Sequence, residues 1–189
     1  MKEALKPVSA LLVSVAILLT GQGLQGTLLP IRASVESFST TSIGLMGAAY
    51  FFGFTIGCLL GVHLVKRVGH IRVFLAMTAI ASTTALIHAL ILYSWFWIFM
   101  RMLTGFCFAV LFVVIESWVN NRSSNENRGV IFSVYVMITL SVQAVGQFLM
   151  LLYEPDGIEL FAIISILVTI AAIPIALSTS PAPYVDQDV

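Results

Sequence analysis

Residues 95–120 read WFWIFMRMLTGFCFAVLFVVIESWVN, a long apolar run that contains only two charged residues, Arg101 and Glu116. An α-helix rises about 1.5 Å per residue, so roughly 20 apolar residues cross the hydrocarbon core of a bilayer. This run is long enough to do so. Five other apolar runs fill most of the chain, at residues 8–29, 43–65, 73–93, 130–153 and 158–178.

The composition agrees with a membrane protein, because 59% of the 189 residues are hydrophobic and only 10% are charged. A soluble domain of this size has too small a core to bury six apolar helices. Inside lipid the backbone must satisfy its own hydrogen bonds, which favours helices. We therefore predict an all-α membrane protein with one six-helix transmembrane domain over residues 1–180. Residues 181–189 are expected to be a polar cytoplasmic tail or the start of an interdomain linker.

The basic residues outside the apolar runs lie mostly on one side of the predicted bundle, and only Arg32 lies on the other. Cytoplasmic loops of membrane proteins are enriched in Lys and Arg. We therefore predict that both termini are cytoplasmic. The residues on the predicted cytoplasmic side are Lys2, Lys6, Lys66, Arg67, Arg72, Arg122 and Arg128.

The two charges within predicted spans are candidates for function, because a charge at a helix centre costs about 2.5–3.5 kcal/mol on insertion scales. Arg101 lies about 10 Å from the midplane, with Gly105 one turn further on the same face. We expect Arg101 to face a water-filled cavity; the alternative is that it snorkels to the interface. Glu116 lies nearer the cytoplasmic side and forms either a static ion pair or one that breaks when the protein changes state. Its candidate partners are Arg67, Arg72 and Arg128.

Polar side chains recur at helical spacing in two other runs. Gln22 and Gln25 lie three residues apart and share a helix face. Polar groups that face lipid are costly, so both sets are expected to face protein or water. They either line a cavity or form hydrogen bonds between helices. The second set, spaced by four residues, is Tyr135, Thr139, Gln143 and Gln147.

Small residues in the second run predict close helix packing. They are Gly53, Gly57 and Gly61, spaced by four. His88 follows Thr84 by one turn and is expected to be a hydrogen-bonded structural histidine, with a proton relay as the alternative. Cys58 and Cys107 lie within spans and are expected to be packing residues. We expect no metal, no cofactor and no nucleic-acid partner.

The loop between the second and third runs carries the first of three motifs that resemble the major facilitator superfamily. Residues 61–72 read GVHLVKRVGHIR, and the family has a glycine, an aspartate and basic residues at this place. Aligned on Gly69, Arg67 and Arg72 match the pattern. Lys66 stands where the family has aspartate, and the leading glycine is displaced by one residue.

Two further motifs extend the resemblance. Residues 101–105 (RMLTG) resemble the fourth-span motif of the superfamily. Residues 113–118 (VVIESW), followed by residues 127–129 (NRG), resemble its YcaD-like bacterial branch. The fifth span lacks the Gly-Pro signature of the drug antiporters.

The resemblance implies the amino-terminal half of a secondary transporter, with six helices in a 3+3 inverted-repeat bundle. It implies a cavity near the midplane, lined by the first, second, fourth and fifth spans, and rocking of two six-helix bundles around a small solute. It also implies a bacterial inner (plasma) membrane and a second six-helix half. Candidate cavity residues are Gln22, Gln25, Arg101, Gly105, Tyr135, Gln143 and Gln147. Candidate inner-gate residues are Lys66, Arg67, Gly69, Arg72, Glu116 and Arg128.

Arg101 is expected to hold an anionic group of the solute or a carboxylate from the second half. If protons drive transport, their carrier is Glu116 or lies beyond this chain. An alternative is a stand-alone six-span protein that acts as a homodimeric carrier or an accessory subunit. An enzyme is not expected, because the sequence lacks the Gly-x-Ser-Gly-type nucleophile that a rhomboid protease needs.

Overall fold

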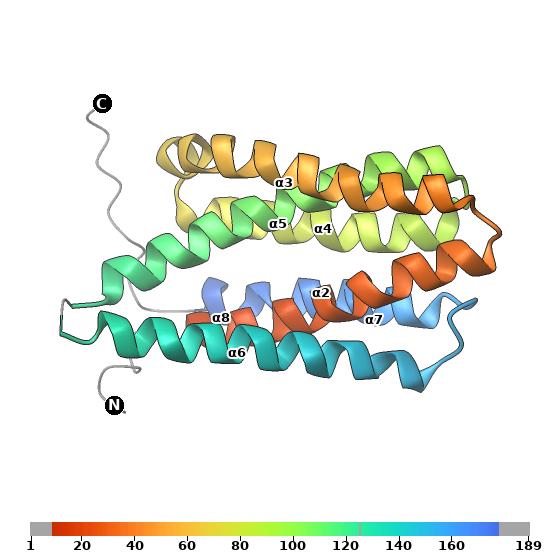
Figure 1. Ribbon diagram of the computed structural model, residues 1–189. Coiled ribbons are helices and arrows are strands. Elements are labelled where there is room, and N and C mark those ends of the chain that lie inside the picture. Colours follow the sequence, from red (N-terminus) through yellow and green to blue (C-terminus); the bar gives the residue numbers. More distant parts are fainter. Residues whose placement is uncertain (1–8, 125, 178–189) are drawn as a thin grey trace.

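The computed structural model describes residues 9–124 and 126–177. All its regular elements are helices, and six of the helical segments are long and apolar enough to cross a membrane (Figure 1). This confirms the predicted all-α, six-span architecture. The residues expected to form the polar tail, 181–189, lie outside the described residues, as do Lys2 and Lys6. The elements are α2 (Ser9–Val35), α3 (Thr40–Val68), α4 (His70–Leu90), α5 (Ser94–Arg122), α6 (Arg128–Phe148), the 3₁₀ helix η2 (Leu149–Leu152), α7 (Glu159–Ile170) and α8 (Ala172–Ala176).

Two prolines shape the helices. Helix α2 continues through Pro30 to Val35, so the expected end at residue 29 is too early. Proline removes one backbone N–H but keeps a helix-compatible φ, and the helix persists because its last turns are buried. Pro174 lies just after the boundary between α7 and α8 and deprives the carbonyl of Ile170 of its donor. The last span is therefore two helical pieces.

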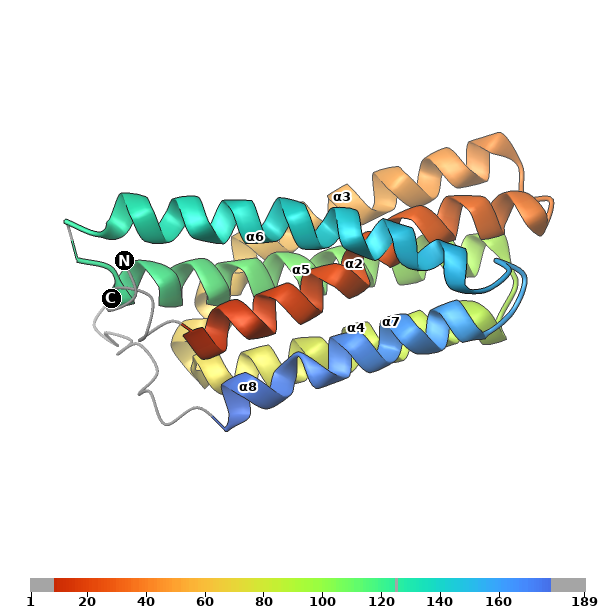
Figure 2. The ribbon, with the colours of Figure 1, turned by 90° about the horizontal axis from the view of Figure 1, so that it is seen from below.

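The helix contacts repeat with a pseudo-twofold pattern. The most extensive contacts join α3 to α5 and α2 to α6; next come α4 with α5 and α2 with α7, while α4 also packs on α7. Exchanging the first three spans for the last three, in order, maps each of these contacts onto another or onto itself. This is the pattern that a 3+3 repeat requires. Figure 2 shows the bundle from below, with α2 running between α6 and α7.

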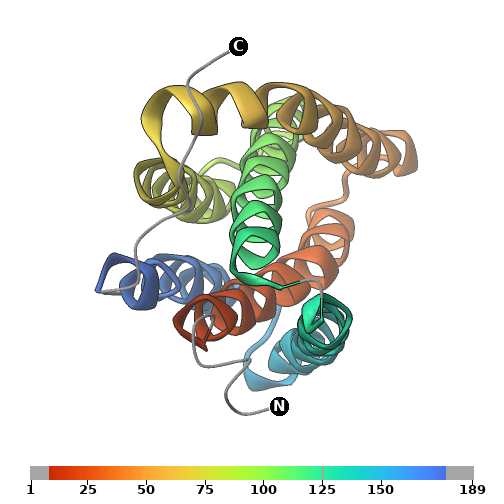
Figure 3. The same cartoon turned by 90° about the vertical axis from the view of Figure 1, so that its left-hand side faces the viewer.

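The end-on view in Figure 3 places α2 and α5 at the centre of the bundle. Helices α4 and α7 lie on one side of this pair, and α3 and α6 lie on the other. Of the most apolar window in each helix, 61% is buried for α2 and 56% for α5, but only 17% for α3 and for α6. Helices α3 and α6 therefore present most of their apolar surface to lipid or to another protein chain.

The two ends of the bundle carry opposite charges. We call one the basic end; it holds Lys66, Arg67, Arg72, Arg122 and Arg128. We call the other the acidic end; it holds Glu36, Glu154, Asp156 and Glu159. At the basic end, Gly69 joins α3 to α4 with φ 95° and ψ 153°, a conformation that is essentially restricted to glycine. A Cβ at Gly69 would meet nothing within 4 Å, so the backbone conformation, not space, requires glycine there.

Candidate solute-binding pocket

A pocket lies where the four helices α2, α3, α5 and α6 approach one another. Its volume is about 350 Å³, within the range of small-molecule sites. Five of the seven predicted cavity residues line it together. They are Gln22, Gln25, Arg101, Gln143 and Gln147.

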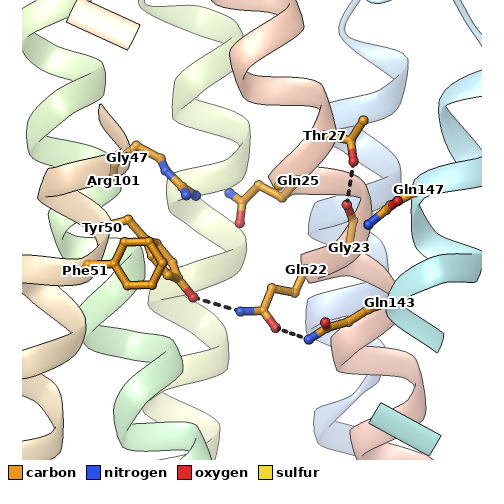
Figure 4. A pocket seen from close by; sticks show the side chains of 11 residues that line it. Gln22, Gly23, Gln25, Thr27, Gly47, Tyr50, Phe51, Arg101, Gln143 and Gln147 are labelled. Carbon is orange, nitrogen blue, oxygen red and sulfur yellow. Dashed lines mark hydrogen bonds between the residues drawn. The ribbon is translucent and has the colours of Figure 1, made fainter. Parts of the chain in front are cut away.

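Arg101 of α5 lines this pocket. The Tyr50 ring of α3 lies against its guanidinium, with 4.3 Å between Arg101 Cζ and the ring centroid. Figure 4 shows Arg101 and Gln25 extending toward one another. Among the described residues, no carboxylate lines the pocket or pairs with Arg101. The pocket therefore carries a positive charge next to an aromatic ring.

Three of the lining side chains form a hydrogen-bonded chain across the pocket (Figure 4). Gln143 Nε2 of α6 donates to Gln22 Oε1 of α2 at 3.3 Å. Gln22 Nε2 donates in turn to the Tyr50 hydroxyl of α3 at 2.8 Å. This chain links three helices, so Gln22 and Gln143 both form hydrogen bonds between helices and line the pocket.

The Gln25 amide leaves an open hydrogen-bond donor at the pocket. Gln25 is only 2% exposed, yet its Nε2 has no hydrogen-bond partner among the described residues. Gly26 also lines the pocket, and its carbonyl lacks a helical donor because Pro30, four residues later, has no N–H. The pocket thus offers a free amide donor and a guanidinium to a bound molecule.

The free space continues toward the acidic end and stops toward the basic end. A second cavity of about 130 Å³ shares Gly26, Gly47 and Arg101 with the first, and its other lining residues lie nearer the acidic end. In the opposite direction the rings of Tyr50, Phe54 and Phe112 follow one another, each 6.1 Å from the next. Beyond them, apolar side chains of α2 and α5 leave no room for a water molecule.

Two predicted cavity residues do not line the pocket. Gly105 is buried in the contact between α5 and α3, where a Cβ would overlap the carbonyl oxygen of Tyr50, so its role is close packing. Tyr135 is buried as part of the apolar core, and it starts the polar stripe one turn before Thr139. The Thr139 hydroxyl bonds the Tyr135 carbonyl at 2.9 Å and needs no cavity. The stripe drifts around α6, so only its last two members reach the pocket.

The predicted inner-gate residues gather at the basic end but do not form the expected ion pairs. Within the described ranges, Glu116 has no salt bridge with Arg67, Arg72 or Arg128. Arg128 instead donates to the side-chain oxygen of Asn120. Lys66, Arg67, Arg72 and Glu116 are exposed on the isolated bundle. The spacing along the chain placed these charges near one end, but their pairing depends on helix rotation.

The predicted packing glycines do pack. A Cβ on Gly53 would overlap the Met102 carbonyl oxygen, and one on Gly57 would lie 2.6 Å from the Phe106 carbonyl oxygen. Gly61 is looser, since its Cβ would lie 3.3 Å from Val113 Cγ2. All three face α5, which confirms close helix packing.

The α2–α6 contact contains two glycines that the sequence analysis missed. A Cβ on Gly23 would overlap the Gln143 carbonyl oxygen, and one on Gly146 would overlap the Thr20 carbonyl oxygen. They lie on different helices far apart in the chain, so no spacing rule pairs them.

Tyr50 and the partners of Arg32 were also missed. Tyr50 stands in an apolar run beside Phe51 and Phe52 and gives no signal of its polar contacts. Arg32 pairs with Glu36 at 2.6 Å and donates to the Pro155 carbonyl at 3.1 Å, which ties α2 to the α6–α7 connection. The four-residue spacing of Arg32 and Glu36 on a helix is the signal that identifies their pair.

His88 forms the predicted hydrogen bond within α4. Its Nδ1 donates to the Thr84 carbonyl at 2.6 Å, and Trp97 lies edge-on at 5.2 Å between ring centroids. Cys107 is buried, Cys58 is exposed, and both are free thiols. No group of potential metal ligands occurs in the described part of the chain.

Comparison with known proteins identifies a transporter family. The family model for the Major Facilitator Superfamily matches residues 11–188. The MFS-type transporter YcaD of Escherichia fergusonii, described as uncharacterized, is 29% identical over 144 residues, which cover 76% of this chain and 38% of that protein. YcaD of Escherichia coli O45:K1, also described as uncharacterized, is 28% identical over the same coverage. The chain thus spans less than two-fifths of the length of these curated relatives.

Proposed function

Because this chain belongs to the Major Facilitator Superfamily, we propose that it forms one half of a secondary active transporter that moves a small solute by alternating access. The observation that carries the proposal is the pocket shared by α2, α3, α5 and α6. It brings Arg101 and four glutamines to one place in a largely apolar bundle. Polar and charged groups inside a membrane are retained where they contact a substrate or an ion.

The second wall of the binding site comes from another six-helix half. Helices α3 and α6 are the least buried, and they flank the pocket. Exposed apolar residues continue along them, with Phe51 at 69% and Leu140 at 64% exposure. A second bundle, in the same polypeptide or in another chain, packs on this side and encloses the solute. Rocking of the two bundles then alternates access.

Access differs between the two ends of the bundle in the proposed cycle. The cavities at Arg101 continue toward the acidic end, whereas the rings of Tyr50, Phe54 and Phe112 close the path to the basic end. The excess of Arg and Lys supports a cytoplasmic position for the basic end, and with it for both termini, in a bacterial plasma membrane. The described arrangement therefore corresponds to a half that is open outward.

The experiment that tests this function is cysteine accessibility in the full-length protein in membranes. Gln143→Cys and Gln147→Cys should react with a membrane-impermeant maleimide, because both positions line the pocket. Val145→Cys on the same helix is the matched control; Val145 is 54% exposed but does not line the pocket, and lipid should protect it. Protection of both glutamine positions in every state would contradict the cavity.

Proton coupling is a separate part of the proposal. Glu116 is the only described carboxylate that lies within a span away from the acidic end. If Glu116 carries the proton, Glu116→Gln should abolish the dependence of uptake on the pH gradient and leave solute counterflow intact. Uptake in Glu116→Gln that keeps the wild-type pH dependence would assign the proton carrier to a residue beyond this chain.

A further inference from the structure

The positive charge of the pocket has no counter-charge in the described chain. Guanidinium stays protonated in proteins, so Arg101 carries its charge permanently. None of the described carboxylates lines either cavity at Arg101. Those carboxylates are Glu36, Glu116, Glu126, Glu154, Asp156 and Glu159. An ion taken out of water needs a partner to offset its desolvation, so the partner of Arg101 must enter the pocket from outside this bundle.

The surroundings of Arg101 leave its hydrogen-bond donors available. Tyr50 lies over the guanidinium, with Arg101 Cζ 4.3 Å from the ring centroid. A ring in this position uses a face of the guanidinium and leaves the N–H groups in its plane free. Within residues 9–124 and 126–177, no acceptor bonds them. A planar fork of N–H donors matches the two oxygens of a carboxylate.

A second donor from another helix points to the same place. Gln25 of α2 extends toward Arg101 (Figure 4). Its Nε2 has no hydrogen-bond partner among the described residues, and the residue is only 2% exposed, so water does not replace that partner. A buried amide donor without an acceptor is unfavourable. An anionic ligand could accept a hydrogen bond from Gln25 with one oxygen and from Arg101 with another. It would supply both the missing acceptor of Gln25 and the missing counter-charge of Arg101.

The charge and the volume of the pocket narrow the class of ligand. One guanidinium balances one negative charge, whereas a phosphate group carries close to two. The pocket of about 350 Å³ is much larger than the carboxylate of a single protein side chain needs. The Gln143–Gln22–Tyr50 chain pairs part of its polar groups with one another, so we assign it to the wall around the rest of the ligand.

We propose that the transported solute is a small organic monocarboxylate, whose carboxylate binds Arg101 through two hydrogen bonds and accepts a third from Gln25. This assignment rests on the proposed transport function and names its substrate class. It competes with the alternative in which a carboxylate of the second half is the permanent partner of Arg101, and the experiment below separates the two.

Thermal unfolding of the purified full-length protein tests the proposal. The probes are acetate, lactate, hexanoate and benzoate at millimolar concentration, each beside its primary amide as a neutral isostere, with inorganic phosphate as a further control. We expect at least one carboxylate to raise the unfolding temperature, while its amide and phosphate do not. Arg101→Gln should abolish the shift, and Arg101→Lys, which keeps the charge but loses the planar fork, should weaken binding at least tenfold.

Gln25→Glu is the sharper variant, because it places a carboxylate beside Arg101. It should raise the unfolding temperature of the ligand-free protein and abolish the response to carboxylates. The proposal is wrong if no carboxylate shifts the wild type, if the amides shift it equally, or if Arg101→Gln retains the response. Absence of any shift, together with a lower unfolding temperature in Arg101→Gln, would assign the counter-charge to the second half.

Uptake into vesicles that contain the full-length protein separates this inference from the transport function. Uptake of a neutral or cationic solute that is unchanged in Arg101→Gln would overturn the carboxylate assignment and leave transport standing. Carboxylate binding without uptake or counterflow of any bound compound would overturn transport and keep the binding site.

Discussion

The two tight helix crossings of the bundle are related by its repeat but differ in what holds them. At the α3–α5 crossing, Gly53 and Gly105 each lie against the backbone of the facing helix. At the α2–α6 crossing, Gly146 and Gly23 do the same. Each crossing is therefore a reciprocal pair of glycines, one from each helix. Without a hydrophobic drive between helices in lipid, such close packing is a main source of their association.

The crossings diverge on either side of these pairs. The α3–α5 contact continues toward the basic end through Gly57 and Gly61. The α2–α6 contact has no further glycine among those described, and α6 gives way to the 3₁₀ helix η2 after Phe148. In place of further glycines, the α2–α6 contact has the hydrogen bond from Gln143 to Gln22. Glycine contacts hold α3 to α5 along much of their length, whereas those between α2 and α6 are confined to one crossing supported by side chains, which makes that contact easier to alter.

Gly53→Ala should have the largest effect. Its Cβ overlaps the Met102 carbonyl oxygen, a backbone atom that adjacent glycine contacts keep from moving, so we expect a loss of about 3 kcal/mol in unfolding free energy. Gly47→Ala is the matched control on the same helix, since a Cβ there meets nothing within 4 Å. It should be neutral or stabilising by up to about 1 kcal/mol. Reversible unfolding in detergent micelles measures both, and equal effects would show that helix propensity dominates.

Gly146→Ala should have an intermediate effect. The new Cβ overlaps the Thr20 carbonyl oxygen, but α6 can tilt away from α2 because no second row of glycines follows. We expect a loss of about 1–2 kcal/mol, toward the lower part of the overpacking range. A loss as large as that of Gly53→Ala in the same unfolding assay would mean that the two crossings are equally rigid.

Removing the amide bond at the α2–α6 crossing should have the smallest effect. Hydrogen bonds between membrane helices contribute about 0.6 kcal/mol on average. A double-mutant cycle of Gln22→Leu and Gln143→Leu should therefore give a coupling energy of about 0.6 kcal/mol in unfolding. Tyr50→Phe tests the other bond of Gln22 and should cost a similar amount. A coupling energy indistinguishable from zero would remove the side-chain contribution from the comparison.

Much of the fold follows from the sequence because the hydropathy and the length of each segment can be read along the chain without knowledge of its neighbours in space. Six apolar runs separated by short polar breaks predict six helices, and the structure has them. The four-residue spacing of Gly53, Gly57 and Gly61 predicts one packing face, because residues four apart share a side of a helix. Arg101 is identifiable for the same kind of reason, since its charge requires a polar environment wherever the helix lies.

The pocket is less predictable, because it depends on how each helix is rotated and where it crosses its neighbours. The Tyr50 hydroxyl accepts a hydrogen bond from Gln22, and the Tyr50 ring packs on the Arg101 guanidinium. Both contacts arise only when α3 lies beside α5 with α2 opposite. Gly105 and Tyr135 share helices with true pocket residues but point into other contacts. Two residues one turn apart on the same helix can therefore differ in role, because one lines a cavity while the other packs in the core.

The sequence alone determined that this chain is a set of membrane-spanning helices with a charge it must shelter, since the free energy of transfer into lipid depends on each segment by itself. Only the tertiary structure decided which polar groups satisfy one another and which stay open. Gln22 and Gln143 find hydrogen-bond partners, while Gln25 Nε2 and the Arg101 guanidinium find none among the described residues. That division depends on distances between helices far apart in the chain, and it separates the groups that hold the bundle together from those available to bind a solute.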